Sequence, residues 1–324
     1  MSVLIYIENT EGVLKKSAYE AASYGREIAN KLNTEAIAIS IGDVEPDQLL
    51  KLGNYGITKI LNVTNKDLNA FANQAYASVI ASAAKKENAS IVIFSNTFSG
   101  KGLAPRVATK LAAGLVVGAT TIPSIQGETL QVQKTVFSSK AIATVSLNSA
   151  IKVLTINPNA FSAKKIEGQA EIENFIPEVN GSDLSTVIKE IVRATDKISL
   201  PEAEIVVSAG RGLKGPENWA MIEELATVLG AATACSKPVS DANWRPHSEH
   251  VGQTGIVVSP NLYIAIGISG AIQHLAGVSS SKTIVVINKD PEAPFFKVAD
   301  YGIVGDAFVV VPQLIQALKA HKGN

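Results

Sequence analysis

The first half of the chain alternates short apolar runs with longer stretches of helical periodicity. The runs are branched and bounded by polar residues, which is typical of buried strands. They lie at Val3–Ile7, Ala36–Ile41, Ile60–Val63 and Ser90–Phe94. Helical spacing predicts helices at Ser17–Leu32, Asp47–Leu52, Ala70–Lys86 and Ala104–Ala113. This strand–helix rhythm predicts a parallel sheet with helices on both faces.

From Val116 to Ile156 the pattern changes to β-branched alternation broken by turns, which predicts a hairpin-rich extension of the sheet. Pro158–Ser185 is expected to be irregular or weakly stranded, and Thr186–Ala194 to form a short helix. The segment Ile198–Glu202, with sequence ISLPE, is predicted to be a linker.

A second strand–helix series follows this segment. Strands are predicted at Ile205–Ser208, Ala232–Cys235, Ile256–Val258, Tyr263–Ile268, Thr283–Ile287 and Ile303–Val304. Helices are predicted at Glu217–Leu229, Ala271–Ala276 and Pro312–Ala320. We therefore expect an α/β protein with two doubly wound parallel-sheet domains: residues 1–195 with the β-rich extension, and a smaller domain over 196–324.

Composition narrows the function classes. Lys+Arg and Asp+Glu both number 29, so a neutral chain has no electrostatic footprint for nucleic acid or an anionic membrane. The single cysteine, Cys235, excludes an intrachain disulfide and fits a reducing compartment; it is expected to be a small core residue rather than a nucleophile. No signal peptide, transit peptide or membrane-spanning run is evident, so a cytoplasmic protein without direct membrane insertion is expected.

The segment Gly210–Gly215, GRGLKG, matches the GxGxxG dinucleotide fingerprint after a predicted strand. The next strand, however, ends in Ser236 and Lys237, with no carboxylate for a ribose before Asp241. This disfavours a standard NAD site, although Arg211 and Lys214 would supply positive charge that suits a phosphate-bearing ligand. The alternative is a glycine turn with solvated basic residues.

Val251–His274 combines a polar glycine turn, a strand and a helix start, which together favour an anion site. Its polar side chains near the turns are Gln253, Thr254, Ser269, Gln273 and His274. They could converge on one ligand, or His274 could be a helix-capping residue. The spacing of the four histidines supports no metal site.

Polar residues also end other predicted strands. Asn288 could contact a base or ribose, or cap its turn. Asp306 precedes the last helix, and Ser95–Arg106 is either a ligand loop or an ordinary strand–helix loop. No nucleophile elbow, P-loop or closely spaced carboxylate pair is found, so no catalytic residue is predicted.

Four segments of the C-terminal half together resemble the α subunit of electron transfer flavoprotein. They are GRGLKGPENW (Gly210–Trp219), VGQTG (Val251–Gly255), LYIAIGISGAIQHLAG (Leu262–Gly277) and Lys282–Asp306. The N-terminal half is similar more weakly, through its α/β rhythm and the GKGLAPR loop, where the family more commonly has Arg-Asp in place of Lys101-Gly102.

The resemblance implies one FAD in the C-terminal domain, no cofactor in the N-terminal domain, and a heterodimer with a β subunit that carries AMP. Thr254 would bond flavin N5, and His274 would lie by the pyrimidine carbonyl end. Lys237 stands where the family commonly has arginine. The implied FAD contacts are Arg211, Ser236, Lys237, Val251, Gly252, Gln253, Thr254, Ser269, Gly270, Ala271, Ile272, Gln273, His274, Asn288 and Asp306.

The resemblance also implies a role. The protein would carry electrons one at a time from flavin dehydrogenases, such as acyl-CoA dehydrogenases of fatty acid β-oxidation, to a membrane quinone reductase. It would have no substrate reaction of its own. The alternatives are an α subunit of a flavin-bifurcating or nitrogen-fixation-type electron transfer flavoprotein, and an NAD(P)-dependent oxidoreductase that uses the GRGLKG turn.

Overall fold

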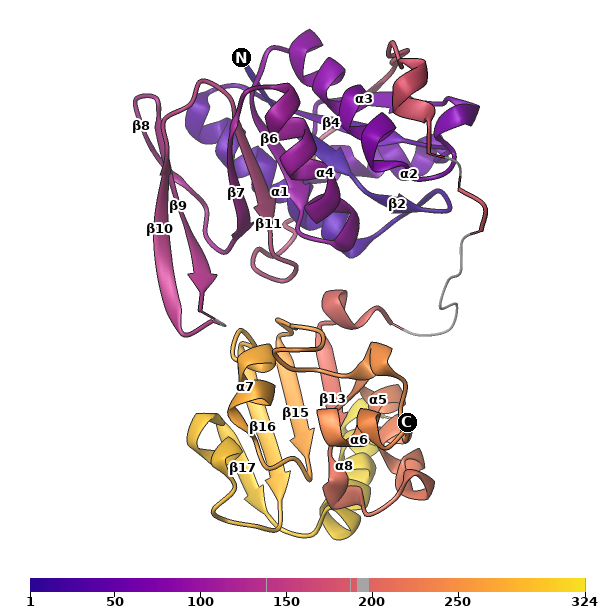
Figure 1. Ribbon diagram of the computed structural model, residues 1–324, viewed down its shortest axis with the longest axis vertical. Helices are drawn as coiled ribbons and strands as arrows, with labels where there is room; N and C mark the ends of the chain where they lie inside the picture. Colours follow the sequence, from indigo (N-terminus) through magenta and orange to yellow (C-terminus); the bar gives the residue numbers. More distant parts are fainter. Residues whose placement is uncertain (138, 187, 191–197, 324) are drawn as a thin grey trace. The chain divides into compact units, whose positions relative to one another are not determined.

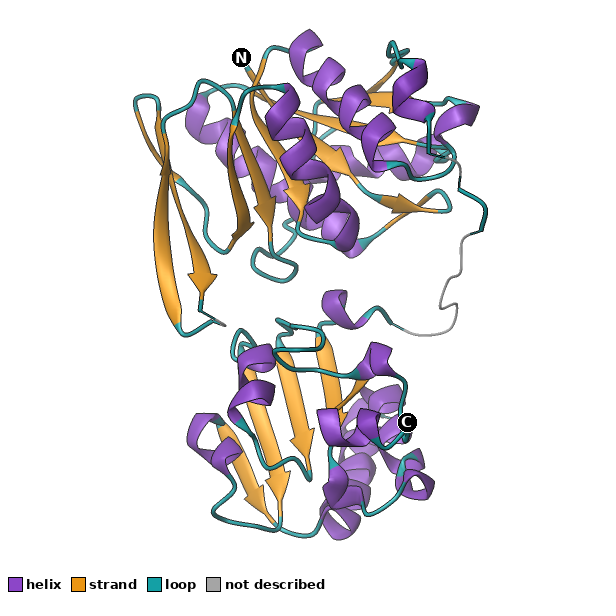
Figure 2. Ribbon diagram, viewed as in Figure 1, coloured by secondary structure: helices purple, strands orange, loops and turns teal. Residues whose placement is uncertain are grey.

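The computed structural model describes residues 1–137, 139–186, 188–190 and 198–323 (Figures 1 and 2). It shows an α/β fold in two units, Met1–Thr135 with Ile142–Arg193 and Val136–Ala141 with Ala194–Asn324. Each unit is built on its own sheet, as the strand–helix rhythm predicts. No helix in the described residues has both the length and the apolar character needed to cross a membrane.

The sheet of the first unit contains the four predicted parallel strands. Its members are β1 (Ser2–Ile7), β4 (Glu35–Ile41), β5 (Lys59–Val63), β6 (Ala89–Ser95), β7 (Gly114–Ala119), β8 (Ser124–Gln126), β9 (Thr129–Val136), β10 (Ala141–Leu147), β11 (Lys152–Ile156) and β12 (Glu171–Asn174). Their order is β10-β9-β7-β11-β6-β1-β4-β5-β12, with β8 paired to β9. A separate two-stranded ribbon joins β2 (Asn9–Thr10) and β3 (Val13–Leu14).

Helices cover both faces of this sheet (Figure 1). They are α1 (Lys16–Leu32), α2 (Pro46–Leu50), α3 (Asn73–Lys86) and α4 (Phe98–Lys110). The alternation of side chains along β1 explains the two layers. Val3, Ile5 and Ile7 pack in one cluster with α1, whereas Leu4 and Tyr6 pack in the other with α3 and α4. Every residue of β1 is therefore buried, as a central parallel strand requires.

The β-rich extension is also present. Strand β9 pairs antiparallel with β7 and with β8, and the chain then returns through β11, which lies parallel between β7 and β6. The N-terminal sheet is therefore mixed. The helix predicted over Thr186–Ala194 lies largely outside the described residues.

The predicted start of α4 at Ala104 is wrong. The helix begins at Phe98, so most of the Ser95–Arg106 loop is helical. Thr97 is the N-cap, and its Oγ1 accepts a hydrogen bond from the Gly100 N–H at 3.1 Å. Capping by a threonine offsets the low helix propensity of the two glycines that follow it.

The second unit contains a five-stranded, fully parallel sheet. Its strands are β13 (Ile205–Ala209), β14 (Ala232–Cys235), β15 (Leu262–Ile266), β16 (Thr283–Asn288) and β17 (Tyr301–Val304). Its helices are α5 (Ala220–Leu229), α6 (Lys237–Asp241), α7 (Ile272–Val278) and α8 (Ala307–Lys322). The strand order β14-β13-β15-β16-β17 reverses between β13 and β15. At such a switch point a crevice opens outside the carboxyl ends of the strands, which is where α/β sheets bind ligands.

Two predictions for the second unit need correction. Ile256–Val258 is not a strand; Ile256 makes only an isolated bridge to Val251, because the Gly255 turn folds the segment back on the preceding loop. The segment Ile198–Glu202 is only partly a linker. Leu200–Glu202 form a 3-10 turn, and Leu200 is buried in the core of the second unit.

Candidate functional site

A cleft with a volume of about 760 Å³ lies at the switch point of the second sheet. The turns that follow β13 and β15 touch through their backbones there. The Gly212 N–H donates to the Gly267 carbonyl at 3.1 Å, and a Cβ placed on Gly212 would lie 2.6 Å from the Gly267 Cα. Glycine is required at this contact. The volume is in the range of small-molecule and cofactor sites.

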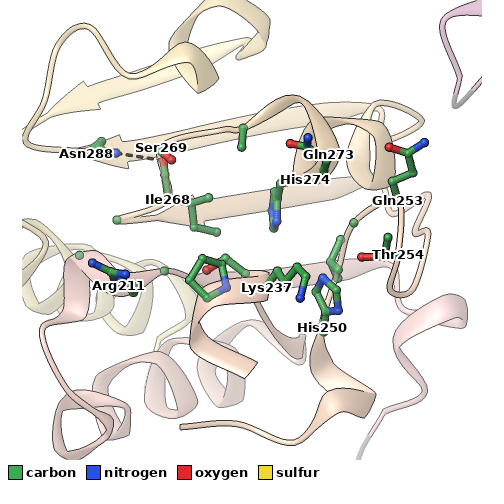
Figure 3. A pocket seen from close by; sticks show the side chains of 18 of the residues that line it. Arg211, Lys237, His250, Gln253, Thr254, Ile268, Ser269, Gln273, His274 and Asn288 are labelled. Carbon is green, nitrogen blue, oxygen red and sulfur yellow. Dashed lines mark hydrogen bonds between the residues drawn. The ribbon is translucent and has the colours of Figure 1, made fainter. Parts of the chain in front are cut away.

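Polar side chains form two rows across this cleft (Figure 3). One row carries Arg211, Lys237, His250 and Thr254, and the facing row carries Asn288, Ser269, His274, Gln273 and Gln253. Twelve of the residues predicted as FAD contacts line the cleft: Arg211, Ser236, Lys237, Val251, Gly252, Gln253, Thr254, Ser269, Ala271, Gln273, His274 and Asn288. The structure therefore brings together segments that are far apart in the sequence.

Three predicted contacts are not among the lining residues. Gly270, at φ +86°, packs against Phe295, and Ile272 is the exposed first residue of α7. Asp306 is the N-cap of α8, where its Oδ1 accepts a hydrogen bond from the Phe308 N–H at 2.9 Å. Their contact with FAD stays a prediction.

Seven further residues line the cleft: Gly210, Gly212, Pro238, Gly267, Ile268, His250 and Asp290. Gly210 and Gly212 lie in the GRGLKG motif, and their position after a predicted strand could have identified them as lining residues. His250 was missed because it lies in a polar segment without periodicity, although it directly precedes the Val251–Gly255 turn.

The Gly210–Gly215 motif does not pass directly from strand to helix. Two 3-10 turns, Arg211–Leu213 and Pro216–Asn218, separate β13 from α5. Within the motif, Arg211 lines the cleft, whereas the Lys214 ammonium lies over the Phe308 ring at 4.8 Å from its centroid. This arrangement departs from a dinucleotide fingerprint but retains one cation for an anionic ligand.

The opposite rim is set by Asn288 at the end of β16. Its side-chain amide donates to the Ile268 carbonyl at 3.0 Å, and its Oδ1 accepts a hydrogen bond from the Asp290 N–H at 3.1 Å. Asn288 therefore both caps its turn and lines the cleft, so the two roles considered for it are compatible.

His274 is a neutral group of the cleft. Its side chain is buried, and Nε2 lies 2.9 Å from the Tyr263 hydroxyl oxygen. Burial, and then the nearby His250, lower the pKa of His274 to about 4. The imidazole is therefore uncharged at neutral pH.

Lys237 supplies the second cation of the cleft. Its Nζ lies 2.8 Å from an oxygen of Asp241, one helical turn later on α6. Cys235, two residues earlier, has its pKa raised to about 12, mainly by burial, and is a thiol rather than a nucleophile at neutral pH. Among the described residues, no group of three or more His, Cys, Asp or Glu is arranged to hold a metal ion.

Comparison with protein families agrees with this site. Residues 3–179 match the electron transfer flavoprotein domain, and residues 199–279 match the electron transfer flavoprotein FAD-binding domain. The chain belongs to the electron transfer flavoprotein family as an α subunit. Its second unit thus contains the FAD-binding domain of that family, and its general role is that of an electron carrier rather than a catalyst.

Three relatives illustrate the extent of the match. The chain is 41% identical to the electron transfer flavoprotein subunit alpha of Bacillus subtilis over 98% of this chain and 97% of that protein. The same subunit of Thermoanaerobacterium thermosaccharolyticum is 37% identical over 99% and 98% of the two chains. The protein FixB of Clostridium saccharobutylicum is 36% identical, with coverage of 98% and 96%.

The residues of this α subunit fit FAD on their own chemistry. Arg211 and Lys237 offer positive charge to a dinucleotide that carries a diphosphate. At Gly252, φ is +151°, and an added Cβ would approach the Gln273 carbonyl oxygen to 3.1 Å, so the backbone of this turn stays open to the cleft.

Proposed function

We propose that the cleft of this α subunit binds FAD, and that the loaded protein carries electrons in a heterodimer with an electron transfer flavoprotein β subunit. The observation that carries the proposal is the position of the cleft. It opens at the switch point of a parallel sheet, and two cations line it. All its lining residues except Asn288 and Asp290 lie in the segment that matches the FAD-binding domain. The FAD contacts are the fifteen residues predicted from the sequence.

Each end of the cleft would have a different task. The Arg211 guanidinium would pair with the diphosphate at the end of β13. At the other end, the Lys237 ammonium and the Thr254 hydroxyl would lie beside the isoalloxazine, while the neutral His274 ring would hydrogen-bond without adding charge. Bound FAD supplies one- and two-electron redox chemistry. Positive charge beside the ring favours its reduced forms, because reduction adds negative charge.

Family membership supports a proposal for the route of the electrons. The donors would be flavin dehydrogenases such as acyl-CoA dehydrogenases, and the acceptor a membrane quinone reductase in the cytoplasmic setting expected from the sequence. Residues 1–195 would form the partner-facing domain without a cofactor, and residues 196–324 the FAD domain. AMP would reside on the β subunit.

A second candidate is an α subunit of a flavin-bifurcating or nitrogen-fixation-type electron transfer flavoprotein. The observation that favours it is the near full-length similarity to a protein named FixB. NADH would then reduce the purified heterodimer without a further protein, whereas the leading proposal requires a reduced dehydrogenase.

The test is co-expression with the candidate β chain, followed by counting FAD and AMP per heterodimer. We expect about one of each, and flavin reduction by a substrate-reduced acyl-CoA dehydrogenase; affinity should fall about tenfold or more in Arg211→Ala, since a charge-assisted hydrogen bond is lost. Lys214→Ala is the matched control, because its ammonium stacks on Phe308 outside the cleft. A heterodimer that contains no flavin would refute the proposal.

A further inference from the structure

Two titratable residues that line the cleft, His250 and Asp290, were not predicted from the sequence. Asp290 is exposed, whereas His250 is buried. Its backbone forms a parallel bridge with Cys235 at the end of β14. The next residue, Val251, donates its N–H to the Cys235 carbonyl at 3.0 Å, and the His250 carbonyl accepts the Ile256 N–H at 2.8 Å. Two hydrogen bonds thus fix the main chain around His250 beside the Lys237 turn.

The ring of His250 is oriented by two glycines. Its side chain lines the cleft although the residue is only 2% exposed. A Cβ added to Gly255 would lie 2.7 Å from Nδ1, and one added to Gly252 would lie 3.4 Å from Nε2. Within the part of the chain that the structure describes, Nδ1 is enclosed and has no hydrogen-bond partner.

These contacts decide where the proton of the neutral ring belongs. Nδ1 has no partner in either tautomer, so only Nε2 can gain a hydrogen bond from a ligand in the cleft. A buried N–H without an acceptor is rarer in proteins than an acceptor without a donor, which favours the proton on Nε2. A neutral imidazole carries its single N–H on the other nitrogen in that case. Nε2 of His250 is therefore the donor.

The surroundings keep this ring neutral. The titratable and charged groups around it are His247, Glu249, Arg245, Lys237, Asp241 and His274. Burial, then His247 and Lys237, lower the pKa of His250, and only Asp241 opposes them. The Glu249 carboxylate is held by Arg245 at 2.7 Å, so its charge is already compensated.

We propose that His250 is a further cofactor-contact residue, whose neutral ring donates a hydrogen bond from Nε2 to a carbonyl oxygen at the flavin end of FAD. This inference rests on the proposed function. In Figure 3, His250 lies between Lys237 and Thr254, towards the end of its row that is remote from Arg211. A guanidinium suits the diphosphate, whereas a neutral donor suits a carbonyl, whose hydrogen bond strengthens when reduction adds negative charge to the ring.

Two amide variants of the full heterodimer test the donor position. Gln places its amide near the position of Nε2, whereas Asn reaches only about as far as Nδ1. We measure the FAD dissociation constant by flavin fluorescence, and the flavin midpoint potential by redox titration at pH 7. His250→Asn should weaken the binding of one-electron-reduced FAD about tenfold more than that of oxidised FAD, which lowers the one-electron potential by about 59 mV. In His250→Gln, the ratio of the dissociation constants of reduced and oxidised FAD should stay within about twofold of the wild-type ratio, because the Gln amide still donates to the same oxygen.

His321→Gln is the control, since His321 is an exposed histidine in the last turn of α8 and does not line the cleft. It should leave affinity and potential unchanged. An unchanged potential in His250→Asn, or equal losses of FAD affinity in the Asn and Gln variants of a folded heterodimer, would overturn the inference. FAD binding by the wild-type heterodimer would still uphold the proposed function in that case. If the wild-type heterodimer binds no FAD, both proposals fail.

Discussion

Each sheet of this α subunit has a switch point between parallel strands, but the polar residues at the two switch points are arranged differently. In the first unit the order reverses between β1 and β6, and the polar residues there bond one another. The Thr97 hydroxyl donates to Glu8 at 2.5 Å, the Asn96 amide donates to Asn157 at 2.6 Å, and the Thr155 hydroxyl donates to Asn96 at 2.8 Å. In the second unit the matching edge opens into the cleft that Arg211 and Lys237 line.

The comparison shows which property of a sheet edge allows it to bind a ligand. Parallel strands bring polar residues to the carboxyl edge in both units, but the ligand capacity depends on whether those residues satisfy each other. The carboxylate of Glu8 also disfavours a phosphate at the first switch point. We therefore expect substitutions at the first edge to change folding alone, and substitutions at the second to change FAD binding or its potential.

The largest effect is expected at the glycine contact of the second edge. In Gly212→Val the new Cβ would lie 2.6 Å from the Gly267 Cα. This atom belongs to the main chain, which cannot move aside as the end of a flexible side chain could. The variant should lose about 3 kcal/mol of unfolding free energy. FAD content should fall about tenfold or more, because the two turns separate. Flavin absorbance per protein and urea unfolding measure both.

Gly181→Val is its control in the first unit, because a Cβ there would meet no atom within 4 Å. It should retain both stability and FAD. Normal flavin content in Gly212→Val would break the assignment of the cleft to the cofactor.

Acid should weaken the second unit through His274. The pKa of this ring is lowered to about 4 in the folded protein, so below its ordinary value near 6.5 the unfolded state binds more protons. Stability is therefore lost as the pH falls from about 6.5 towards 4, by about 2 kcal/mol between pH 7 and pH 5.

Tryptophan fluorescence isolates this unit, since both tryptophans of the chain, Trp219 and Trp244, belong to its core. Urea unfolding of the FAD-depleted protein at the two pH values should show a smaller loss in His274→Gln. Equal losses in both proteins would contradict the role assigned to His274.

At the first edge, Asn96→Ala should lower the unfolding free energy by about 1–2 kcal/mol, because it removes the donor to Asn157 and the acceptor of the Thr155 hydroxyl proton. The FAD dissociation constant should stay at the wild-type value. Circular dichroism follows the unfolding, and Asn54→Ala, at an exposed position, is the control. Weaker FAD binding in Asn96→Ala would show that the two edges are coupled.

The smallest effect is expected at Lys237. Lys237→Ala should lower the one-electron flavin potential, by about 59 mV for each tenfold loss in the stabilisation of the reduced ring. Asp241→Asn should raise the potential slightly, because it removes the carboxylate that lies 2.8 Å from the Lys237 ammonium. A redox titration that gives the wild-type midpoint for Lys237→Ala would exclude Lys237 from the flavin end.

Continuous apolar runs made the buried strands predictable. The run at β1, for example, is apolar on both faces, which is typical of a strand buried on both sides, so its secondary structure was predictable from the local sequence. The beginning of α4 was not predictable from periodicity, because it depends on the Thr97 cap and two glycines lie in its first turns. Ile256–Val258 has the composition of a strand, but the Gly255 turn denies it a neighbour to pair with.

Part of the site was also predictable from local sequence. Arg211 lies in a glycine-rich turn after β13, Thr254 in the Gly252–Gly255 turn, and His274 in the first turn of α7. Glycine turns and helix starts of this kind mark a ligand site in the local sequence. His250 has no such mark. Only the pairing of its backbone with Cys235 brings the ring to the cleft, and that pairing links segments that the sequence alone does not connect.

The cleft has a consequence for how the protein is made. Its lining runs from Gly210 to Asp290, so its last wall appears only when nearly the whole chain has been synthesised. A nascent chain on the ribosome can complete the first sheet, whose strands all precede residue 175, well before that point. With FAD in this cleft as proposed, we expect maturation in two stages, of which only the late one needs a vitamin-derived molecule. Cells short of riboflavin should accumulate full-length chains in which only the second stage is unfinished.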